Sequence, residues 1–273
     1  MRTWQRRALA CGLAAGAYLA ARCWFRRRPY GADWQLSTLQ APHGDRIAMT
    51  HIGRGHRAAV IVAHGLAKSK NDHRIFGLCQ YLACQMDVIA FDWPGHGASG
   101  GTCDLDLQSR ADELARIINH ARSLGYARVG LIGCSMGAAA AIVAVGQGAP
   151  VDTLVAVSTP LRPVLAGKRI PSWPLAPFAR MTGTRLAPRI GSRTWPLAWI
   201  DRVSPTPLLS IHNGLDTLVP ARDSHALYGI ARQPKAYIEA PTALHAATAS
   251  TQSHIAAWLQ SMLDTERDSE PPN

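Results

Sequence analysis

The chain has 273 residues, of which 47% are hydrophobic, so it is long enough to bury one large core or two small ones. Its formal net charge of +11 is high, but the sequence carries no nucleic-acid-binding motif, and no nucleic acid is expected as a partner. The six cysteines form no CxxC pair, and no Cys/His spacing suits zinc, which excludes the common metal motifs and a small disulfide-stabilised domain.

The positive charge is concentrated in two stretches. Residues 1–35 hold seven arginines and one aspartate, and residues 160–203 hold eight Lys or Arg and one aspartate, so the rest of the chain sums to −2. Each stretch also contains three tryptophans. Indole rings and arginines are favoured where a membrane meets water. Membrane-surface contact is therefore predicted through both stretches, with a solvated basic surface as the alternative for the second.

The first predicted element is the N-terminal segment, residues 1–30. An uncharged run at 8–21 follows an Arg-rich start and precedes Arg22 and the arginines at 26–28. The run alone is shorter than the roughly 17–25 residues of a transmembrane helix. The arginines that follow it disfavour a cleaved signal peptide. This pattern predicts a short membrane anchor or an interfacial helix, and arginines on both sides leave its orientation open.

Strands and helices are then predicted to alternate along the chain. Apolar runs typical of strands lie at 47–53, 58–65, 87–95, 128–133, 153–159, 207–213 and 236–241. Helical patterns lie at 72–85, 109–125, 136–147, 220–232 and 247–264. The alternation predicts an α/β domain over residues 36–265, with a mainly parallel sheet covered on both faces. Residues 160–203 interrupt it as a proline-rich insertion without a clear strand, and residues 266–273 are a polar tail expected to be disordered.

The turn Gly133-Cys134-Ser135-Met136-Gly137 joins a predicted strand to an Ala-rich helix and fits G-x-S-x-G. In such a turn the central residue has strained dihedrals and its side chain is exposed at the tip, while the glycines avoid collisions with the strand and helix. Ser135 is therefore the predicted nucleophile. Cys134 still belongs to the strand end and is expected to point into the packing as a small buried hydrophobe.

A second strand end, His64-Gly65, leads into a loop. The backbone N–H of Leu66 in this loop and that of Met136 are predicted to form an oxyanion hole. His64 itself is interpreted as structural.

Two further strand ends carry an acid and a base. Asp216 comes after a strand and a short loop. At such a place a buried carboxylate can orient an imidazole, and the alternative is that Asp216 is an ordinary turn or cap aspartate. His245 follows the last strand and suits general acid and base work, whereas its rival His254 lies inside the final helix. Each of these two signals is weak alone, but Ser135, Asp216 and His245 occur in the chain order expected for a catalytic triad at the strand ends of such a sheet.

A competing motif is the run at 95–100, which matches G-x-G-x-x-G. Dinucleotide binding needs a helix that opens directly at these glycines, with an acid at the end of the next strand. Here Pro94 precedes the run, no helix begins until about Leu105, and the acids Asp112 and Glu113 lie inside that helix. We therefore predict no nucleotide cofactor, and no metal or organic cofactor of any other kind.

Across residues 36–265 the chain resembles the α/β-hydrolase superfamily, and within it the branch of monoacylglycerol-lipase-like and Bem46-like serine hydrolases. The segments HGLAKSKND, FDWPGHGASGG, IHNGLDTLVP and APTALHA carry the resemblance. Three positions depart from the branch pattern: Pro94 stands where Arg is common, Asn213 stands at a usual glycine, and the last segment lacks its glycine. Asn213 is a mild departure, because Asn tolerates left-handed dihedrals best after Gly.

The resemblance implies an α/β-hydrolase fold with residues 160–203 as a lid, and a Ser-His-Asp mechanism on a small acyl ester. Together with the predicted anchor, it favours a lipid-like substrate such as a monoacylglycerol or lysophospholipid. An acyl thioesterase and a ligand-binding member that catalyses nothing are the alternatives. The expected location is a membrane, a bacterial inner membrane with the hydrolase domain on the cytoplasmic side, although the side stays open.

Overall fold

The computed structural model describes residues 34–41, 44–162, 165, 167–241, 243–245 and 249–264. The predicted anchor at residues 1–30 and the predicted tail at 266–273 lie outside the described residues. Within the described ranges, no helix combines the length and the hydrophobicity that crossing a membrane requires.

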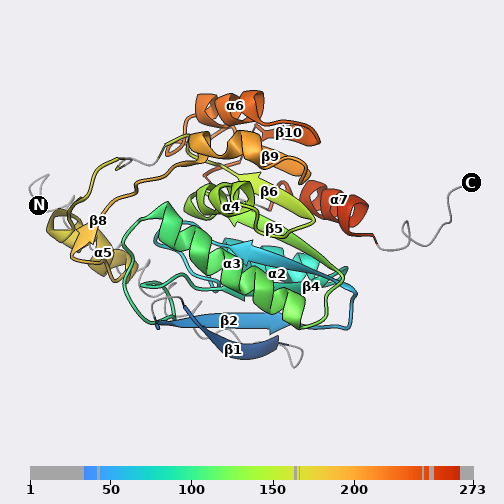
Figure 1. The fold of residues 1–273 in the computed structure, drawn as a ribbon, viewed down its shortest axis with the longest axis horizontal. Coiled ribbons are helices and arrows are strands. Elements are labelled where there is room, and N and C mark those ends of the chain that lie inside the picture. The colour runs from blue at the N-terminus through green and yellow to red at the C-terminus, as the bar shows by residue number, and fades with distance from the viewer. Residues whose placement is uncertain are drawn as a thin grey trace, which may run out of the picture.

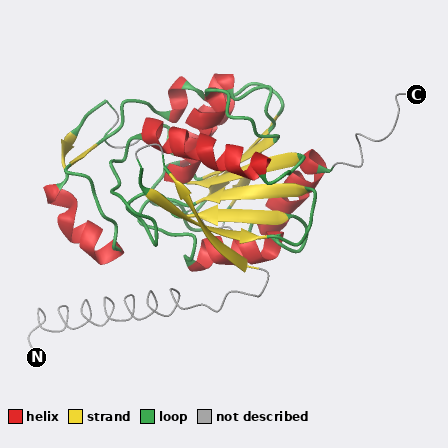
Figure 2. Ribbon diagram, turned by 60° about the horizontal axis from the view of Figure 1, so that its bottom comes forward, coloured by secondary structure: helices red, strands yellow, loops and turns green. Residues whose placement is uncertain are grey.

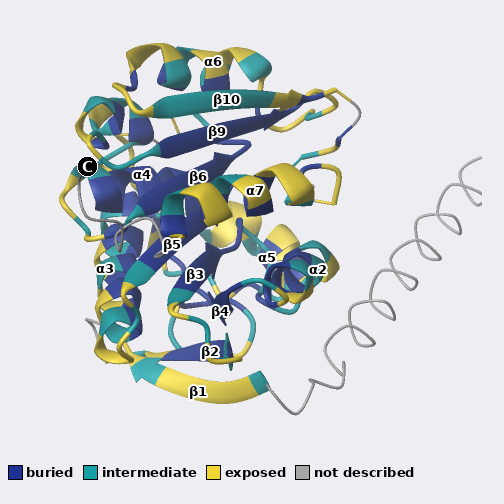
Figure 3. Ribbon diagram, turned by 90° about the vertical axis from the view of Figure 1, so that its right-hand side faces the viewer, coloured by how far each residue is buried: buried dark blue, intermediate teal, exposed yellow. Residues whose placement is uncertain are grey.

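An eight-stranded sheet forms the centre of the fold (Figure 1). In spatial order its strands are β1 (Trp34–Gln40), β2 (Arg46–Ile52), β4 (Asp87–Phe91), β3 (Ala58–Ala63), β5 (Arg128–Cys134), β6 (Thr153–Val157), β9 (Leu208–Asn213) and β10 (Lys235–Ala240). The β1–β2 and β2–β4 pairs are antiparallel, and every other pair is parallel. The prediction of a mainly parallel sheet is therefore confirmed. Its central strands are buried on both faces (Figure 3), which explains their continuous apolar sequences.

Helices cover both faces of the sheet (Figure 2). The helices α3 (Leu107–Ser123), α4 (Met136–Gly146) and α6 (Ala221–Ile230) bury their apolar residues in one core cluster, and α2 (His73–Leu82) and α7 (Gln252–Leu263) do so in the other. Residues 136–145 of α4 are all buried. Its alanines keep the helix narrow, so the sheet, α3 and the insertion pack around it.

The insertion at residues 160–203 lies beyond one end of the central strands, where Figure 1 shows α5 (Ala176–Thr182) and β8 (Arg189–Ile190) standing apart from the sheet. It also contains β7 (Ile170–Pro171) and three short 3₁₀ turns at 173–175, 196–198 and 200–202. The sequence shows no clear strand in this insertion, but β7 and β8 form a two-residue antiparallel pair there. Strands of two residues are too short to show the alternation of apolar and polar residues by which a strand is predicted, and the segment is rich in proline.

Most other predicted elements are present with shifted ends. Strand β4 ends at Phe91 rather than at residue 95, because the chain turns over residues 93–96, where the His96 N–H donates to Trp93 O at 2.9 Å. Helix α7 begins at Gln252, later than predicted. Strand β1 was not predicted, because it is an edge strand whose residues are mostly exposed, so its sequence has no buried face to reveal it.

Candidate active site

Ser135 occupies a strained turn between β5 and α4. Its φ of 53° and ψ of −115° lie in a region that side chains rarely adopt, and such strain costs about 1–3 kcal/mol. Two backbone hydrogen bonds hold it there, one from Ser135 N–H to Val157 O at 2.8 Å and one from Ala139 N–H to Ser135 O at 2.9 Å. The surrounding fold therefore forces this geometry and presents the serine hydroxyl at the tip of the turn.

The two glycines that flank this turn are required by close packing. A Cβ on Gly133 would lie 2.5 Å from Ala138 Cα, and one on Gly137 would lie 2.3 Å from Ala63 O. Both distances are too short for any side chain. The G-x-S-x-G pattern is thus explained by the crossing of β3, β5 and α4 at this point.

Cys134 is the last residue of β5 and is 1% exposed. Burial raises the pKa of its thiol to about 12, so it stays protonated and unreactive at neutral pH. The prediction that Cys134 points into the packing is confirmed.

Asp216 and His245, predicted from separate strand ends, are brought together. His245 Nδ1 lies 2.7 Å from Asp216 Oδ2, and the Asp216 side chain is fully buried. The other carboxylate oxygen accepts hydrogen bonds from the N–H groups of Leu218 and Val219, each at 2.9 Å. With Nδ1–H donating to the carboxylate, Nε2 of a neutral imidazole is left as an acceptor.

The carboxylate of Asp216 is held ionised by its donors. Burial alone raises its pKa, but the hydrogen bonds from the Val219 backbone, the His245 ring and the Leu218 backbone outweigh that cost. The net result is a pKa below the usual range for aspartate. A permanent negative charge therefore lies against the imidazole at neutral pH.

A cavity of about 780 Å³ is lined by four of the five predicted site residues: Leu66, Ser135, Met136 and His245. The fifth, Asp216, lies behind His245. Its wall is mainly apolar, with Leu105 and Leu107 from the sheet domain and Leu165, Phe178 and Met181 from the insertion. A volume of this size falls within the range of small-molecule sites, about 300–1,000 Å³. Ser135 and His245 thus open onto a space that suits an apolar ligand.

The loop after β3 runs alongside the serine. A Cβ placed on Gly65 would lie 3.3 Å from the Ser135 Cβ and 3.9 Å from its Oγ, so only a glycine permits this approach without displacing a neighbour. Leu66 follows directly, and Met136 is the first residue of α4, whose leading N–H groups have no partner inside the helix. Both predicted oxyanion donors therefore belong to backbone that borders the serine.

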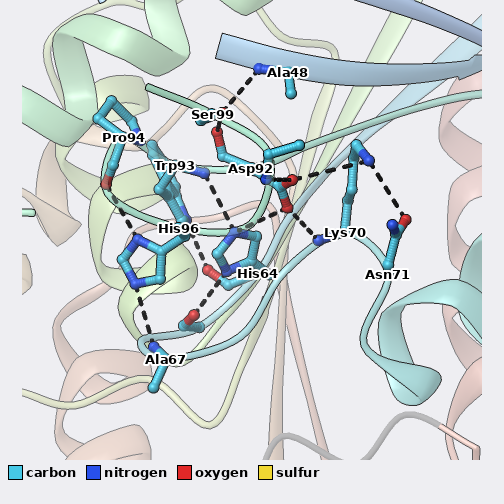
Figure 4. A network of polar contacts seen from close by, with 12 residues as sticks. Ala48, His64, Ala67, Lys70, Asn71, Asp92, Trp93, Pro94, His96 and Ser99 are labelled. Carbon is cyan, nitrogen blue, oxygen red and sulfur yellow. Dashed lines mark hydrogen bonds and ion pairs between the residues drawn. The ribbon is translucent and has the colours of Figure 1, made fainter. Parts of the chain in front are cut away.

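A buried polar network fixes this loop from behind (Figure 4). His64 Nδ1–H donates to Gly65 O at 2.7 Å, and its Nε2 accepts the Trp93 N–H at 3.3 Å. Trp93 Nε1–H returns a hydrogen bond to His64 O at 2.8 Å. The interpretation of His64 as structural agrees with this arrangement, since both ring nitrogens are used within the fold.

The segment at residues 92–100 supplies the rest of the network. The Asp92 carboxylate accepts the N–H groups of Lys70 and Ala98 at 2.7 and 2.9 Å, and His96 Nε2 accepts the Ala67 N–H at 3.3 Å. Its glycines serve this turn: a Cβ on Gly97, at φ +47°, would lie 2.2 Å from Asp92 Oδ2. No helix opens at residues 95–100, so the G-x-G-x-x-G run has no dinucleotide-binding context.

Acid is expected to weaken the fold through the two network histidines. Burial is the main cause that lowers the pKa of His64 from 6.5 to about 4 and that of His96 to about 3. At pH values between these lowered pKa values and 6.5, the unfolded chain binds more protons than the folded chain does. The free energy of unfolding should therefore fall as the pH falls through this window, by about 1.4 kcal/mol per pH unit for each histidine.

Urea unfolding across this window measures that slope. His96→Gln should remove about one histidine's share of that slope, whereas Gln260→Ala, at an exposed position of α7, should leave the slope unchanged. Equal slopes for wild type and His96→Gln would contradict the prediction.

Two residues near the site were missed from the sequence. Arg74 of α2 lines the cavity and donates from Nη1 to His245 O at 2.8 Å, and Asn213 Nδ2 donates to Leu244 O at 2.7 Å. Asn213 is the last residue of β9, so its backbone is extended and does not use the left-handed conformation that Asn tolerates. The only sign of Asn213 in the sequence was that it replaces the usual glycine of the segment. Nothing in the sequence pointed to Arg74.

No group of three or more His, Cys, Asp or Glu side chains suited to a metal ion occurs among the residues that the structure describes.

Comparisons with known proteins agree with this architecture. Over 235 residues the chain is 28% identical to the protein YqkD of Bacillus subtilis, a match that covers 77% of this chain and 72% of that protein. It is 27% identical over 212 residues to YfhR of Escherichia coli K12, covering 76% and 69%.

Among solved structures, the Pyrococcus furiosus esterase Pf2001 aligns with a TM-score of 0.67 at 21% identity, covering 84% of this chain and 93% of that one. A monoacylglycerol lipase from Paleococcus ferrophilus aligns at 0.62 and 20% identity, covering 79% and 99%. These likenesses show a shared fold. The family model for the alpha/beta hydrolase family matches residues 60–270, and with the sheet order and the serine turn above, the chain belongs to that family.

Proposed function

We propose that the protein hydrolyses carboxylic esters through an acyl-enzyme on Ser135, with His245 as general base and acid and Asp216 as its partner. One observation carries the proposal: a serine on a strained turn and an imidazole paired with a buried carboxylate open onto the same apolar cavity. This is the constellation that activates a hydroxyl, recognised by geometry rather than by sequence position.

In the first half of the reaction, the Ser135 oxygen attacks the ester carbonyl and His245 Nε2 takes its proton. Asp216 holds the ring in the tautomer that leaves Nε2 free and stabilises the imidazolium that forms. The N–H groups of Leu66 and Met136 bind the oxygen that becomes negative, and each such donor is typically worth about 10²–10³ in rate. The intermediate collapses as His245 protonates the leaving alcohol.

In the second half, water attacks the acyl-enzyme. His245 removes a proton from the water, the oxyanion forms again, and the acid leaves as Ser135 recovers its proton. No step requires a metal or organic cofactor.

The cavity favours a substrate with a long apolar acyl chain, such as a monoacylglycerol or a lysophospholipid. Leucine side chains, Phe178 and Met181 line a space large enough for such a chain. Turnover of a series of esters should rise with chain length. Good turnover of short esters with poor turnover of every long one would contradict this substrate class.

Intact-mass analysis after treatment with a fluorophosphonate tests the reaction itself. The wild type should gain one adduct, Ser135→Ala should gain none, and Cys134→Ala should react like the wild type because the thiol is buried. Failure of folded wild type to react would overturn the proposed mechanism and favour a protein that binds its ligand without catalysis.

We further propose that the insertion docks on an anionic lipid surface. Residues 160–200 contain seven Lys or Arg and no Asp or Glu. Exposed apolar side chains lie in the insertion and around the cavity, among them Trp173 at 76%, Met181 at 54% and Leu218 at 73% exposure. Basic residues attract anionic lipid, at about 1 kcal/mol each, and exposed indole and aliphatic groups favour the interface.

Hydrolysis of a long-chain monoacylglycerol in phosphatidylglycerol or phosphatidylcholine vesicles tests the docking. The wild type should be several-fold faster on the anionic vesicles. Lys168→Gln with Arg169→Gln, two exposed positions of the insertion outside the cavity lining, should lose this preference but keep its rate on a short soluble ester. The exposed edge-strand change Leu36→Ser should keep both. Equal rates on the two vesicle types would contradict the docking proposal.

A further inference from the structure

The loop that carries His245 is held at three consecutive backbone carbonyls. Those of residues 243, 244 and 245 accept hydrogen bonds, in that order, from Leu215 N–H at 3.0 Å, from Asn213 Nδ2 at 2.7 Å and from Arg74 Nη1 at 2.8 Å. The three donors come from different places: the loop after β9, the end of β9, and α2. The backbone of residues 243–245 is therefore hydrogen-bonded both to the segment that carries Asp216 and to helix α2.

Asn213 connects this loop to the acid. Its side chain is fully buried at the end of β9, and its own backbone carbonyl accepts the Asp216 N–H at 2.8 Å. Asn213 thus contacts both segments: its backbone carbonyl binds the turn that carries Asp216, and its side chain binds the loop that carries His245. The 2.7 Å contact between imidazole and carboxylate depends on both.

Arg74 connects the same loop to the oxyanion side. It is the second residue of α2, whose N-cap Asp72 accepts the Arg74 N–H at 3.2 Å and pairs with Lys68 at 3.1 Å. Lys68 belongs to the loop that follows Leu66. A short chain of polar contacts therefore runs from the oxyanion loop through the start of α2 to the carbonyl of His245.

Among the described residues of this loop, the small side chain of Ala243 is buried, but the larger side chain of Leu244 is not. Leu244 is 55% exposed, and the sequence there has no glycine to allow a tight turn. The position of the imidazole then depends on the polar donors. A displacement of about 1 Å of a reacting group costs up to about 10²-fold in rate.

We infer that Arg74 and Asn213 are positioning residues that hold His245 between Asp216 and Ser135, an inference that rests on the reaction proposed above. Neither side chain takes part in proton transfer. Each acts through the backbone of the histidine loop, so its loss should lower kcat far more than it changes KM.

Arg74→Met and Asn213→Leu remove the donors while keeping most of the side-chain volume. Each should lower kcat about tenfold to 10²-fold, with KM within about threefold of wild type, and slow fluorophosphonate labelling by a similar factor. Arg74→Lys restores a donor and should recover part of the loss. Arg122→Met is a matched control: Arg122 Nη1 also donates to a backbone carbonyl, that of Ala127 at 2.8 Å, and lies outside the cavity lining.

Two readouts separate positioning from general damage. In a His245→Ala background, Arg74→Met and Asn213→Leu should no longer lower the residual rate, because they act through that histidine. In proton NMR, the downfield Nδ1–H signal of His245, assigned by its loss in His245→Ala, should shift in both variants and stay in place in Arg122→Met.

The inference is overturned if both folded variants keep kcat within about twofold of wild type, or if their losses persist unchanged without His245. A wild type that neither turns over esters nor reacts with fluorophosphonate would instead overturn the proposed function. In that case the NMR signal still decides whether these two side chains place the ring.

Discussion

Replacing Ser135 by alanine is expected to lower kcat for ester hydrolysis by about 10⁶-fold, with little change in substrate affinity. The reason is that the Ser135 oxygen is the proposed nucleophile, and the thiol beside it in the chain cannot replace it. Cys134, next in the chain, is buried with its thiol pKa raised to about 12. The backbone N–H groups of Leu66 and Met136 remain, so a small residual rate over water should persist.

Steady-state kinetics on a long-chain ester, with unfolding curves as a check on folding, measure this loss. Ser135→Ala removes only an oxygen, so the strained turn keeps its packing and the variant should fold. Cys134→Ala is the control for a change at the same turn and should stay within a few-fold of wild type. A Ser135→Ala enzyme that keeps a tenth of the wild-type rate would show that another group is the nucleophile.

Replacing Asp216 by asparagine is expected to lower kcat by about 10⁴-fold. The carboxylate accepts the His245 Nδ1–H at 2.7 Å and is held ionised by two backbone donors. An amide at this place presents its own N–H to the ring, which favours the tautomer with the proton on Nε2. That tautomer has no lone pair at Nε2 to take the serine proton.

Asp223→Asn provides the matched control for this change. Asp223 also lines the cavity, but its carboxylate accepts the Leu161 N–H at 3.1 Å and has no contact with His245 among the described residues. Its loss should change kcat by a few-fold at most. If Asp216→Asn and Asp223→Asn lost activity equally, the pairing of Asp216 with the histidine would have no special role in catalysis.

The neutral histidines behind the site show how the fold keeps the oxyanion loop in place without adding charge. His64 and His96 lie 5.3 Å apart between ring centroids, and burial holds both uncharged at neutral pH. Each ring then donates one hydrogen bond and accepts another, as His64 does with Gly65 and Trp93. Protonation of either ring would remove an acceptor that fixes backbone of this region.

Those parts of the site that follow from local chemistry could be predicted from the sequence. Gly133 and Gly137 around Ser135 indicated a turn that leaves no room for a side chain, and the structure shows collisions with Ala138 and Ala63 as the cause. Buried parallel strands read as continuous apolar runs, so the sheet was predictable as well. The boundaries of the strands and helices were less predictable, because they depend on turns such as the one over residues 93–96 that follows β4.

Which polar residues contact one another depends on the packing of the whole domain and could not be predicted from the sequence. Asp216 and His245 are 29 residues apart, and Arg74 lies 171 residues before the carbonyl it binds. The parallel pairing of β9 with β10 brings the first pair together, and the packing of α2 beside the histidine loop brings the second. Contacts of this kind leave no periodic pattern or fixed spacing in the sequence, because the two residues are far apart in the chain and meet only when the whole domain folds. Asn213 stood out only as a missing glycine, and its hydrogen bond to Leu244 O exists because two strand ends reach the same edge of the sheet.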